Sequence, residues 1–187
     1  MIPAQNIQSK NLLDLDSNLN VIYQLIDGLR QTTPQVLVLR DNQARYGGYN
    51  SDYVDMQFEY NSTNFYSTAL SYDTDEHTIT VDPTLYTNYV LDGAIQYYVS
   101  TTNSTATIYF RIIEIDENGT ETTLQPFYRM PVGTLTSGHQ KVLHIHQNFS
   151  VKSTTKKIKF QITTNDTVQP SMSAVSFELT GLSANMN

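Results

Sequence analysis

Hydrophobic and polar residues alternate with a period of two along most of the chain after Pro34. Successive side chains of a β-strand point to opposite faces of a sheet, so this alternation predicts half-buried strands. We expect strands at 35–40, 53–60, 64–72, 77–81, 94–99, 105–116, 120–124, 142–150, 157–164 and 174–179. Turn-forming residues separate several of them, at 61–63, 73–76, Asp92-Gly93 and Asn118-Gly119.

About nine or ten short strands with turns at this spacing, and no helix between them, are typical of an antiparallel sandwich. A parallel α/β fold is disfavoured because it would need a helix between successive strands. The sequence therefore predicts a mainly β protein, an antiparallel β-sandwich of the jelly-roll type that spans 35–187. An extended arm and one short α-helix are predicted to precede it.

Residues 1–34 differ from the rest of the chain, because apolar residues recur there at alternating steps of three and four. This is the a/d pattern of a heptad repeat. Its members are Leu12, Leu15, Leu19, Ile22, Ile26 and Leu29. A cap at Asp16 or Ser17 and a stop at Gly28 place the helix at about 17–30, after a polar, extended arm.

Two interpretations of this helix stay open. It is either a seam between copies of the chain or an amphipathic helix that lies on the sandwich or on a neighbouring protein. Leu and Ile are mixed at a and d, which lacks the dimer signature and permits higher oligomers. In both cases 1–34 is predicted to serve oligomerisation or anchoring.

Composition excludes several classes of function. The 187-residue chain has 18 acidic and 11 basic residues, a net charge of −7, which argues against a nucleic-acid partner. It has no Cys, so disulfides, thiolate chemistry and Cys-bound zinc are ruled out. No apolar run has the length of a membrane span, and no signal-like start precedes the arm. We therefore expect no membrane partner and synthesis in a host cytoplasm.

The order of elements from Thr78 to Leu179 carries a resemblance to a known family. The segments concerned are Thr78–Pro83 with Tyr86, Ile95–Val99, Thr107–Ile115 with the turn at Glu117–Gly119, Phe149–Val151, Lys157–Ile162 and Val175–Leu179. Their succession resembles the trimeric jelly-roll knobs of the tumour-necrosis-factor and C1q-like superfamily, including versions in bacteriophage structural proteins. The chain departs from that pattern at Leu85 and at Thr154-Thr155, where the family has glycine and glycine-aspartate.

His144 and His146 are candidate metal ligands, because two residues separated by one on a strand lie on the same face. A threefold axis would bring six imidazole nitrogens together there, which resembles the His-x-His sites of some phage fibres. The alternative is a pair that faces solvent or is hydrogen-bonded, with Leu143 and Ile145 turned to the core. No cofactor is expected.

Two acidic clusters, Asp73/Asp75/Glu76 and Glu114/Asp116/Glu117, are candidate calcium sites. Neither has the spaced oxygen ligands of an EF-hand loop, so solvated carboxylates are the expected reading. The chain also lacks a Gly-x-Ser-x-Gly elbow and a phosphate-binding loop, and we expect no enzymatic activity. Tyr46, Tyr49 and Tyr53, in a tyrosine-rich region, are candidates for stacking on a sugar or anchoring an interface, unless they face the core.

These observations, with the resemblance, predict a non-enzymatic structural protein of a virion, a trimeric capsid decoration or cement protein. Its expected partners are further copies of the chain and the major capsid protein or another virion protein. The alternative is a receptor- or glycan-binding knob of a phage fibre or tail, whose tyrosine-rich loops would contact a host-surface glycan. A carbohydrate-active enzyme domain is a third interpretation.

Overall fold

The computed structural model describes residues 17–25, 34–48, 51–63, 69–98, 107–131, 140–165 and 171–183. Residues Pro34–Ala184 form one compact unit, and the helix at 17–25 belongs to another. The predicted helix is present over 17–25, while its remainder and the predicted arm lie outside the described residues. No described helix has the length and apolar character needed to cross a membrane.

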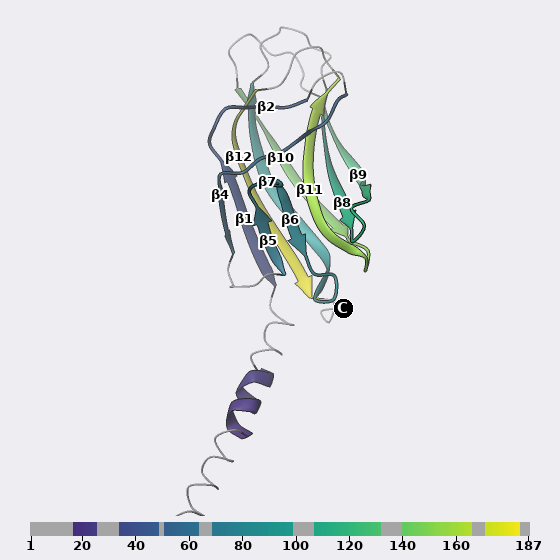
Figure 1. Ribbon diagram of the computed structural model, residues 1–187. Helices are drawn as coiled ribbons and strands as arrows, with labels where there is room; N and C mark the ends of the chain where they lie inside the picture. The colour runs from purple at the N-terminus through teal and green to yellow at the C-terminus, as the bar shows by residue number, and fades with distance from the viewer. Residues whose placement is uncertain are drawn as a thin grey trace, which may run out of the picture. The chain divides into compact units, whose positions relative to one another are not determined.

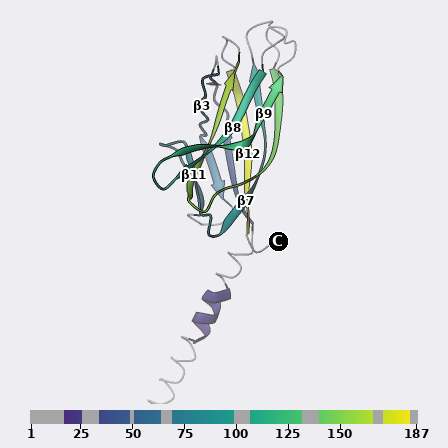
Figure 2. The same ribbon diagram turned by 90° about the vertical axis from the view of Figure 1, so that its right-hand side faces the viewer.

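The compact unit is built from two six-stranded sheets, in which every pair of neighbouring strands is antiparallel (Figures 1 and 2). Sheet A has the order β10 (Gln140–Ser150), β7 (Tyr86–Tyr98), β12 (Ser171–Ser183), β1 (Gln35–Asp41), β4 (Tyr60–Thr63), with β2 (Arg45–Tyr46) beside β12. Sheet B has the order β5 (Leu70–Asp73), β6 (Thr78–Val81), β11 (Thr155–Thr164), β8 (Thr107–Asp116), β9 (Glu121–Pro131), with β3 (Val54–Asp55) beside β11.

Consecutive strands cross repeatedly from one sheet to the other, as β6, β7 and β8 do. This connectivity is that of a jelly roll, and it confirms the predicted antiparallel sandwich. The alternation that predicted the strands also places the core. Residues at every second position of β8, β11 and β12 are buried, namely Ile108, Phe110, Ile112, Ile158, Phe160, Ile162, Val175, Phe177 and Leu179.

Aromatic rings from both sheets meet at the centre of the core. Phe58, Phe110, Phe160 and Phe177 pack with ring centroids 5.4 to 6.3 Å apart, several of them edge to face. Each such pair contributes about 0.5–1.5 kcal/mol beyond the burial of its surface. This cluster joins the two sheets, since Phe177 belongs to sheet A and Phe110 and Phe160 belong to sheet B.

The structure corrects three predictions about the strands. The predicted turn at Asp92-Gly93 lies inside β7, which begins eight residues before the strand expected at 94–99. The predicted turn at 61–63 is part of β4. The single strand expected at 53–60 is replaced by the two-residue β3 and the start of β4, although Met56 and Phe58 between them are buried.

Gly93 is needed for packing rather than for a turn. It pairs with Ile145 on one side and Phe177 on the other, in a row that faces the core. A Cβ at this position would lie 2.2 Å from Cδ1 of Phe177 and 2.5 Å from the carbonyl oxygen of Ser176. The Phe177 ring therefore occupies the space of a side chain at position 93, which only glycine allows. Asn118-Gly119 is a turn, as predicted, with Gly119 at a φ of 78°.

Tyr97 of β7 carries a buried hydroxyl that has no hydrogen-bond partner in the described part of the chain. A buried polar group without a partner destabilises the fold by about 1–3 kcal/mol, because it has lost its bonds to water. We therefore expect Tyr97→Phe to raise the free energy of unfolding by about 1 kcal/mol, measured by chemical denaturation. Tyr89→Phe is the control and should destabilise, since the Tyr89 hydroxyl donates to the carbonyl of Tyr86 at 3.1 Å. A destabilised Tyr97→Phe protein would contradict the expectation.

Candidate functional site

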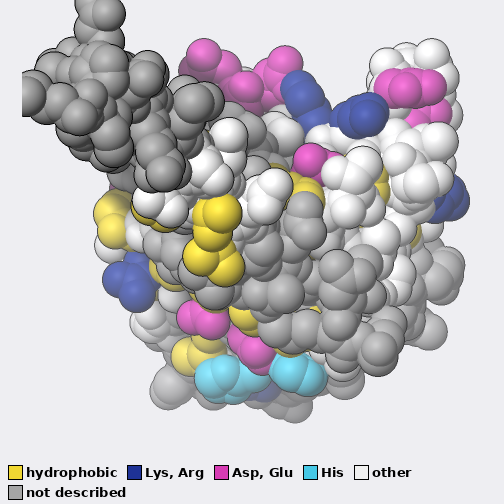
Figure 3. All heavy atoms as spheres, turned by 90° about the horizontal axis from the view of Figure 1, so that it is seen from below, with side chains coloured by type: hydrophobic (Ala, Val, Ile, Leu, Met, Phe, Trp, Pro, Cys, Tyr) yellow, Lys and Arg dark blue, Asp and Glu magenta, His cyan; other side chains and the backbone are white. Residues whose placement is uncertain are grey.

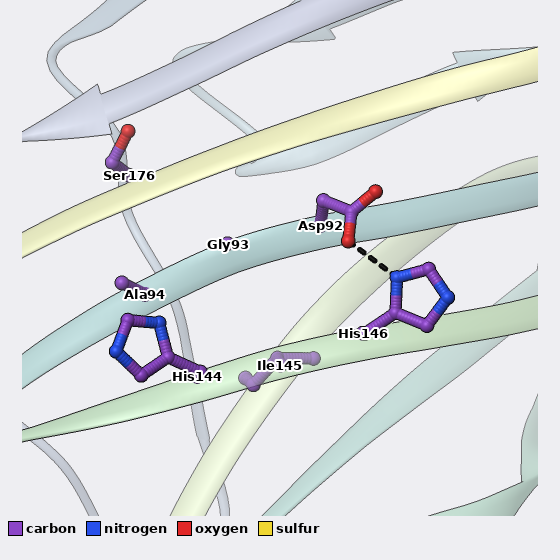
Figure 4. Close-up of a pocket in the computed structure, with 7 residues that line it drawn as sticks. All are labelled: Asp92, Gly93, Ala94, His144, Ile145, His146 and Ser176. Carbon is purple, nitrogen blue, oxygen red and sulfur yellow. Dashed lines mark hydrogen bonds and ion pairs between the residues drawn. The ribbon is translucent and has the colours of Figure 1, made fainter.

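The outward face of sheet A brings the two candidate histidines next to an acidic residue from another strand. His144 and His146 are exposed on β10, while Ile145 between them is buried, so both imidazoles lie on one face as predicted. Asp92 of β7 is directly opposite His146 in the strand register. Its Oδ1 is paired with Nδ1 of His146 (Figure 4). Seen from below, histidine and acidic side chains gather at one edge of the molecule (Figure 3).

The register of sheet A aligns these residues in two neighbouring rows. One row runs from His146 through Asp92 and Glu178 to Val38. The next runs from His144 through Ala94 and Ser176 to Arg40. The short side chains of the second row leave a shallow hollow of about 410 Å³, whose lining includes both histidines and Asp92 (Figure 4).

No three His, Asp or Glu side chains in the described ranges are arranged to hold a metal ion within one chain. The pair at His144 and His146 therefore offers two nitrogen ligands and no third. The residues on either side of the pair, Leu143 and Gln147, carry no carboxylate that could orient the rings. Asp92 does orient one of them, and this partner is 54 residues away in the chain.

The outward face of sheet B carries ion pairs that join β11 to neighbouring segments. Lys159 of β11 lies 3.1 Å from Asp55 and 2.8 Å from Glu121, and these pairs raise its pKa against the opposing effect of burial. Lys157 is paired with Glu76. Lys157 and Lys159 thus lie on the outer face of β11, with both ammonium groups in ion pairs.

The three candidate tyrosines are not all brought together. Tyr46 of β2 is 64% exposed and lies beside β12 of sheet A, whereas Tyr53 lies against sheet B. The Arg111 guanidinium carbon stands 3.6 Å from the centroid of the Tyr53 ring, and Arg111 Nε also donates to Gln161 at 2.7 Å. Arg111 therefore covers one face of the Tyr53 ring. Tyr49 lies outside the described residues.

The acidic clusters use their carboxylates to hold turns. Oδ1 of Asp73 accepts hydrogen bonds from the amides of Asp75 and Glu76 at 2.9 and 3.0 Å. Oδ1 of Asp116 accepts from the amides of Asn118 and Thr120, both at 2.8 Å. These bonds to backbone N–H groups are those of turn-forming aspartates, and they account for both positions without calcium.

Glu114 is the one member of these clusters that is buried. Its Oε2 accepts a hydrogen bond of 2.9 Å from the Thr155 hydroxyl, and its Oε1 is paired with Lys152. Lys152 itself is largely exposed, so the ammonium group caps the buried carboxylate from the solvent side. A small cavity of about 50 Å³ beside Glu114 is lined mainly by threonines. The site is a buried charge with its counter-ion, and it contributes to the fold.

Asp116 gives a pH-dependent prediction. The Thr120 amide, followed by the Asn118 amide, lowers the pKa of Asp116 below its ordinary value. A carboxylate with a lowered folded-state pKa stabilises the protein above its unfolded-state pKa, and loses this effect as the pH falls through the folded-state value. We expect the wild type to be more stable than Asp116→Asn at pH 7, with the difference shrinking below about pH 4. Urea denaturation at a series of pH values measures it, and a difference that does not change with pH would contradict it.

The described helix presents apolar residues to its surroundings. Leu19 and Ile22, the two seam positions within 17–25, are 40% and 50% exposed, and Val21, Tyr23 and Leu25 are exposed by 51%, 61% and 62%. The other predicted seam positions, Leu12, Leu15, Ile26 and Leu29, lie outside the described residues.

Comparisons with known proteins support the fold. No protein-family model matches the chain, and no curated protein matches it. Among solved structures, murine APRIL at pH 8.0 superimposes with a TM-score of 0.52 and 12% identity, over 80% of this chain and 100% of that one.

A chain from the crystal structure of the T13 particle of infectious bursal disease virus gives a TM-score of 0.51 and 16% identity, over 81% of this chain and 32% of that one. A chain of the Gt strain of the same virus gives 0.49 and 17%, over 82% and 33%. The present chain thus spans about a third of the length of these viral chains. At such identities the likeness is one of fold, and this chain shares its jelly roll with murine APRIL and with the viral chain.

Proposed function

We propose that this chain is a non-enzymatic structural protein of a bacteriophage particle, a trimer that decorates or cements the capsid. The observation that carries the proposal is the combination of a jelly roll, shared with a chain of a viral particle, and a helix whose apolar residues are exposed. The pattern-level resemblance to trimeric phage knobs gives the proposal its trimeric state and its phage origin.

The helix supports an assembly role on physical grounds. A helix of this length is marginal in water by itself, and most helical stability in proteins comes from packing of an apolar face. In the heptad that places Leu19 at a and Ile22 at d, Tyr23 falls at e and Leu25 at g. Apolar residues at e and g widen the stripe beyond the a/d seam of a two-stranded coiled coil, which favours a bundle of more than two helices.

Two measurements on the full chain test the proposal. Analytical ultracentrifugation should return the mass of a trimer, and a stable monomer would contradict it. Mass spectrometry and cryo-electron microscopy of purified particles should then place the chain on the capsid shell. Location at a tail or fibre tip would contradict the decoration role.

The second candidate function is a receptor- or glycan-binding knob. The observation that favours it is the exposure of two aromatic side chains in one region of the sequence, Tyr46 at 64% and Tyr60 at 54%. Tyrosine rings can stack on sugars and anchor interfaces. A glycan array separates the two functions. A knob should bind defined glycans, and Tyr46→Ala and Tyr60→Ala should each abolish that binding. A decoration protein should bind capsids and no glycan.

A further inference from the structure

We propose that His77 is a pH-sensitive switch, which holds the chain at Phe58 in place only while the imidazole ring is neutral. Two hydrogen bonds in series form the connection. The backbone amide of Phe58 donates to the Tyr72 hydroxyl oxygen at 3.1 Å, and this oxygen lies 3.3 Å from Nδ1 of His77. The first bond is buried, whereas the His77 side chain is only half-buried. A proton taken up from solvent at His77 therefore acts on a bond inside the fold.

The donors and acceptors present fix the direction of both bonds. An amide N–H only donates, so the Tyr72 oxygen accepts from Phe58. The hydroxyl has one proton of its own, and the described residues offer it no acceptor other than Nδ1 of His77. Burial raises the pKa of Tyr72, so the hydroxyl keeps this proton at neutral and acid pH. Nδ1 is therefore the acceptor, which requires a neutral ring with its proton on Nε2.

Protonation of His77 removes this acceptor. Both nitrogens of an imidazolium ring carry protons, so Nδ1 becomes a donor and the Tyr72 proton loses its partner. A buried polar group without a partner is unfavourable, because it has lost its bonds to water. The ring and the hydroxyl must then separate or turn, and the Phe58 amide loses a fixed acceptor. Imidazoles in general take up this proton below about pH 6.5.

The turn that carries His77 supplies another partner for the protonated ring. Asp73, at the start of this turn, interacts electrostatically with His77. Glu76 is the neighbouring acidic residue, but its carboxylate is paired with Lys157 of β11. Asp73 is thus the carboxylate that attracts an imidazolium ring away from Tyr72. The switch exchanges one partner for another, so its effect is local and does not require the whole sandwich to lose stability.

The other charged groups nearby keep their charge over the relevant pH range. Asp75 is exposed in the same turn. Asp41 of β1 and Arg45 of β2 act on Tyr72, and they are paired with each other at 2.8 Å. Glu59, next to Phe58 in the chain, is hydrogen-bonded to Gln43. Carboxylates and guanidinium groups stay ionised between about pH 7.5 and pH 5, whereas an imidazole does not.

The segment that the switch holds belongs to the core. Phe58 lies between β3 and β4, where no strand ladder holds its amide. Its ring packs edge to face on Tyr72, with centroids 5.4 Å apart, and also on Phe160. The Met56 amide, two residues earlier, donates to the carbonyl oxygen of Phe160 at 2.8 Å. Met56 is therefore held without His77, and its amide is an internal reference for Phe58.

The backbone of His77 gives a second reason to assign a role to its ring. Its φ is 57°, in the left-handed region that costs most side chains free energy and that glycine adopts freely. A histidine persists there when its surroundings hold it, as the bond to Tyr72 does. Asparagine also tolerates this region, so His77→Asn removes the titrating ring while keeping the turn.

Amide hydrogen exchange of the full chain, followed by NMR at about pH 7.5 and about pH 5, tests the proposal. The measured quantity is the protection factor of the Phe58 amide divided by that of the Met56 amide. We expect this ratio to fall about tenfold or more in the wild type at the lower pH. In His77→Asn it should be the same at both pH values. In Tyr72→Phe it should be low at both, because the acceptor is missing.

His144→Asn is the matched control, since it removes an exposed histidine from sheet A and leaves His77 in place. It should show the pH response of the wild type. A ratio that does not change with pH in the wild type would overturn the proposal. An equal change in His77→Asn would also overturn it, because another group would then be responsible. The proposal concerns a single chain and does not depend on the proposed capsid function.

Discussion

Replacing Leu19 and Ile22 together by Asp should convert the proposed trimer into monomers while the β-sandwich stays folded. Both side chains are exposed in the single chain, and they occupy the seam positions a and d of the helix. A charge buried without a partner costs about 3 kcal/mol or more, which weakens association by roughly a hundredfold or more for each substitution. The sandwich should survive, because the helix and Pro34–Ala184 belong to different compact units.

Sedimentation velocity measures the oligomeric state, and circular dichroism with thermal unfolding reports on the sandwich. The matched control is Asn20→Asp with Gln24→Glu, which adds the same charge at the b and f positions of the same helix. This control should remain a trimer. A trimer that persists in the Leu19/Ile22 variant would exclude the helix as the seam, and an unfolded sandwich would mean that the helix is part of the domain core.

Gly93→Ala should destabilise the sandwich by about 3 kcal/mol, the upper part of the usual range for overpacking a core. The new Cβ would lie 2.2 Å from the Phe177 ring and 2.5 Å from the Ser176 carbonyl oxygen. Relief would require β12 to move away from β7, or Phe177 to leave the aromatic cluster that joins the two sheets. Chemical denaturation measures the change as a lower midpoint.

Gly119→Ala is the control for this substitution. A Cβ at Gly119 would meet nothing within 4 Å, and only its positive φ opposes a side chain. Its cost should therefore stay near 1–2 kcal/mol, that of a left-handed backbone. If Gly93→Ala were no more destabilising than Gly119→Ala, the close approach of Phe177 would not be the reason for glycine at position 93.

The fold was largely predictable because its strands follow the simple rule of alternation. In β8 and β11 one face of each strand packs against the core, so buried apolar residues recur at every second position. Phe110 and Phe160 are the central residues of these two series. The turn at Gly119 was predictable for a similar reason, since an Asn-Gly pair favours a positive φ locally. Both signals are contained in a few adjacent residues.

The errors occur where a local signal has a distant cause. Asp92-Gly93 has the composition of a turn, but the glycine makes room for the ring of Phe177. Phe177 is 84 residues further along the chain. The turn predicted at 61–63 became a strand because β1 offers it a partner at the edge of sheet A. Neither contact can be read from the neighbouring residues, since both depend on which strands become neighbours.

The candidate metal site illustrates the same division. Alternation alone placed His144 and His146 on one face, because that relation lies within a single strand. The pairing of His146 with Asp92 depends on the register between β10 and β7, and the hollow depends on β12 bringing Ser176 alongside Ala94. The sequence by itself thus determined most of the strands, their inward residues and the apolar helix. Only the tertiary structure decided which outward side chains meet, because strand order and register are set by the packing of the whole core.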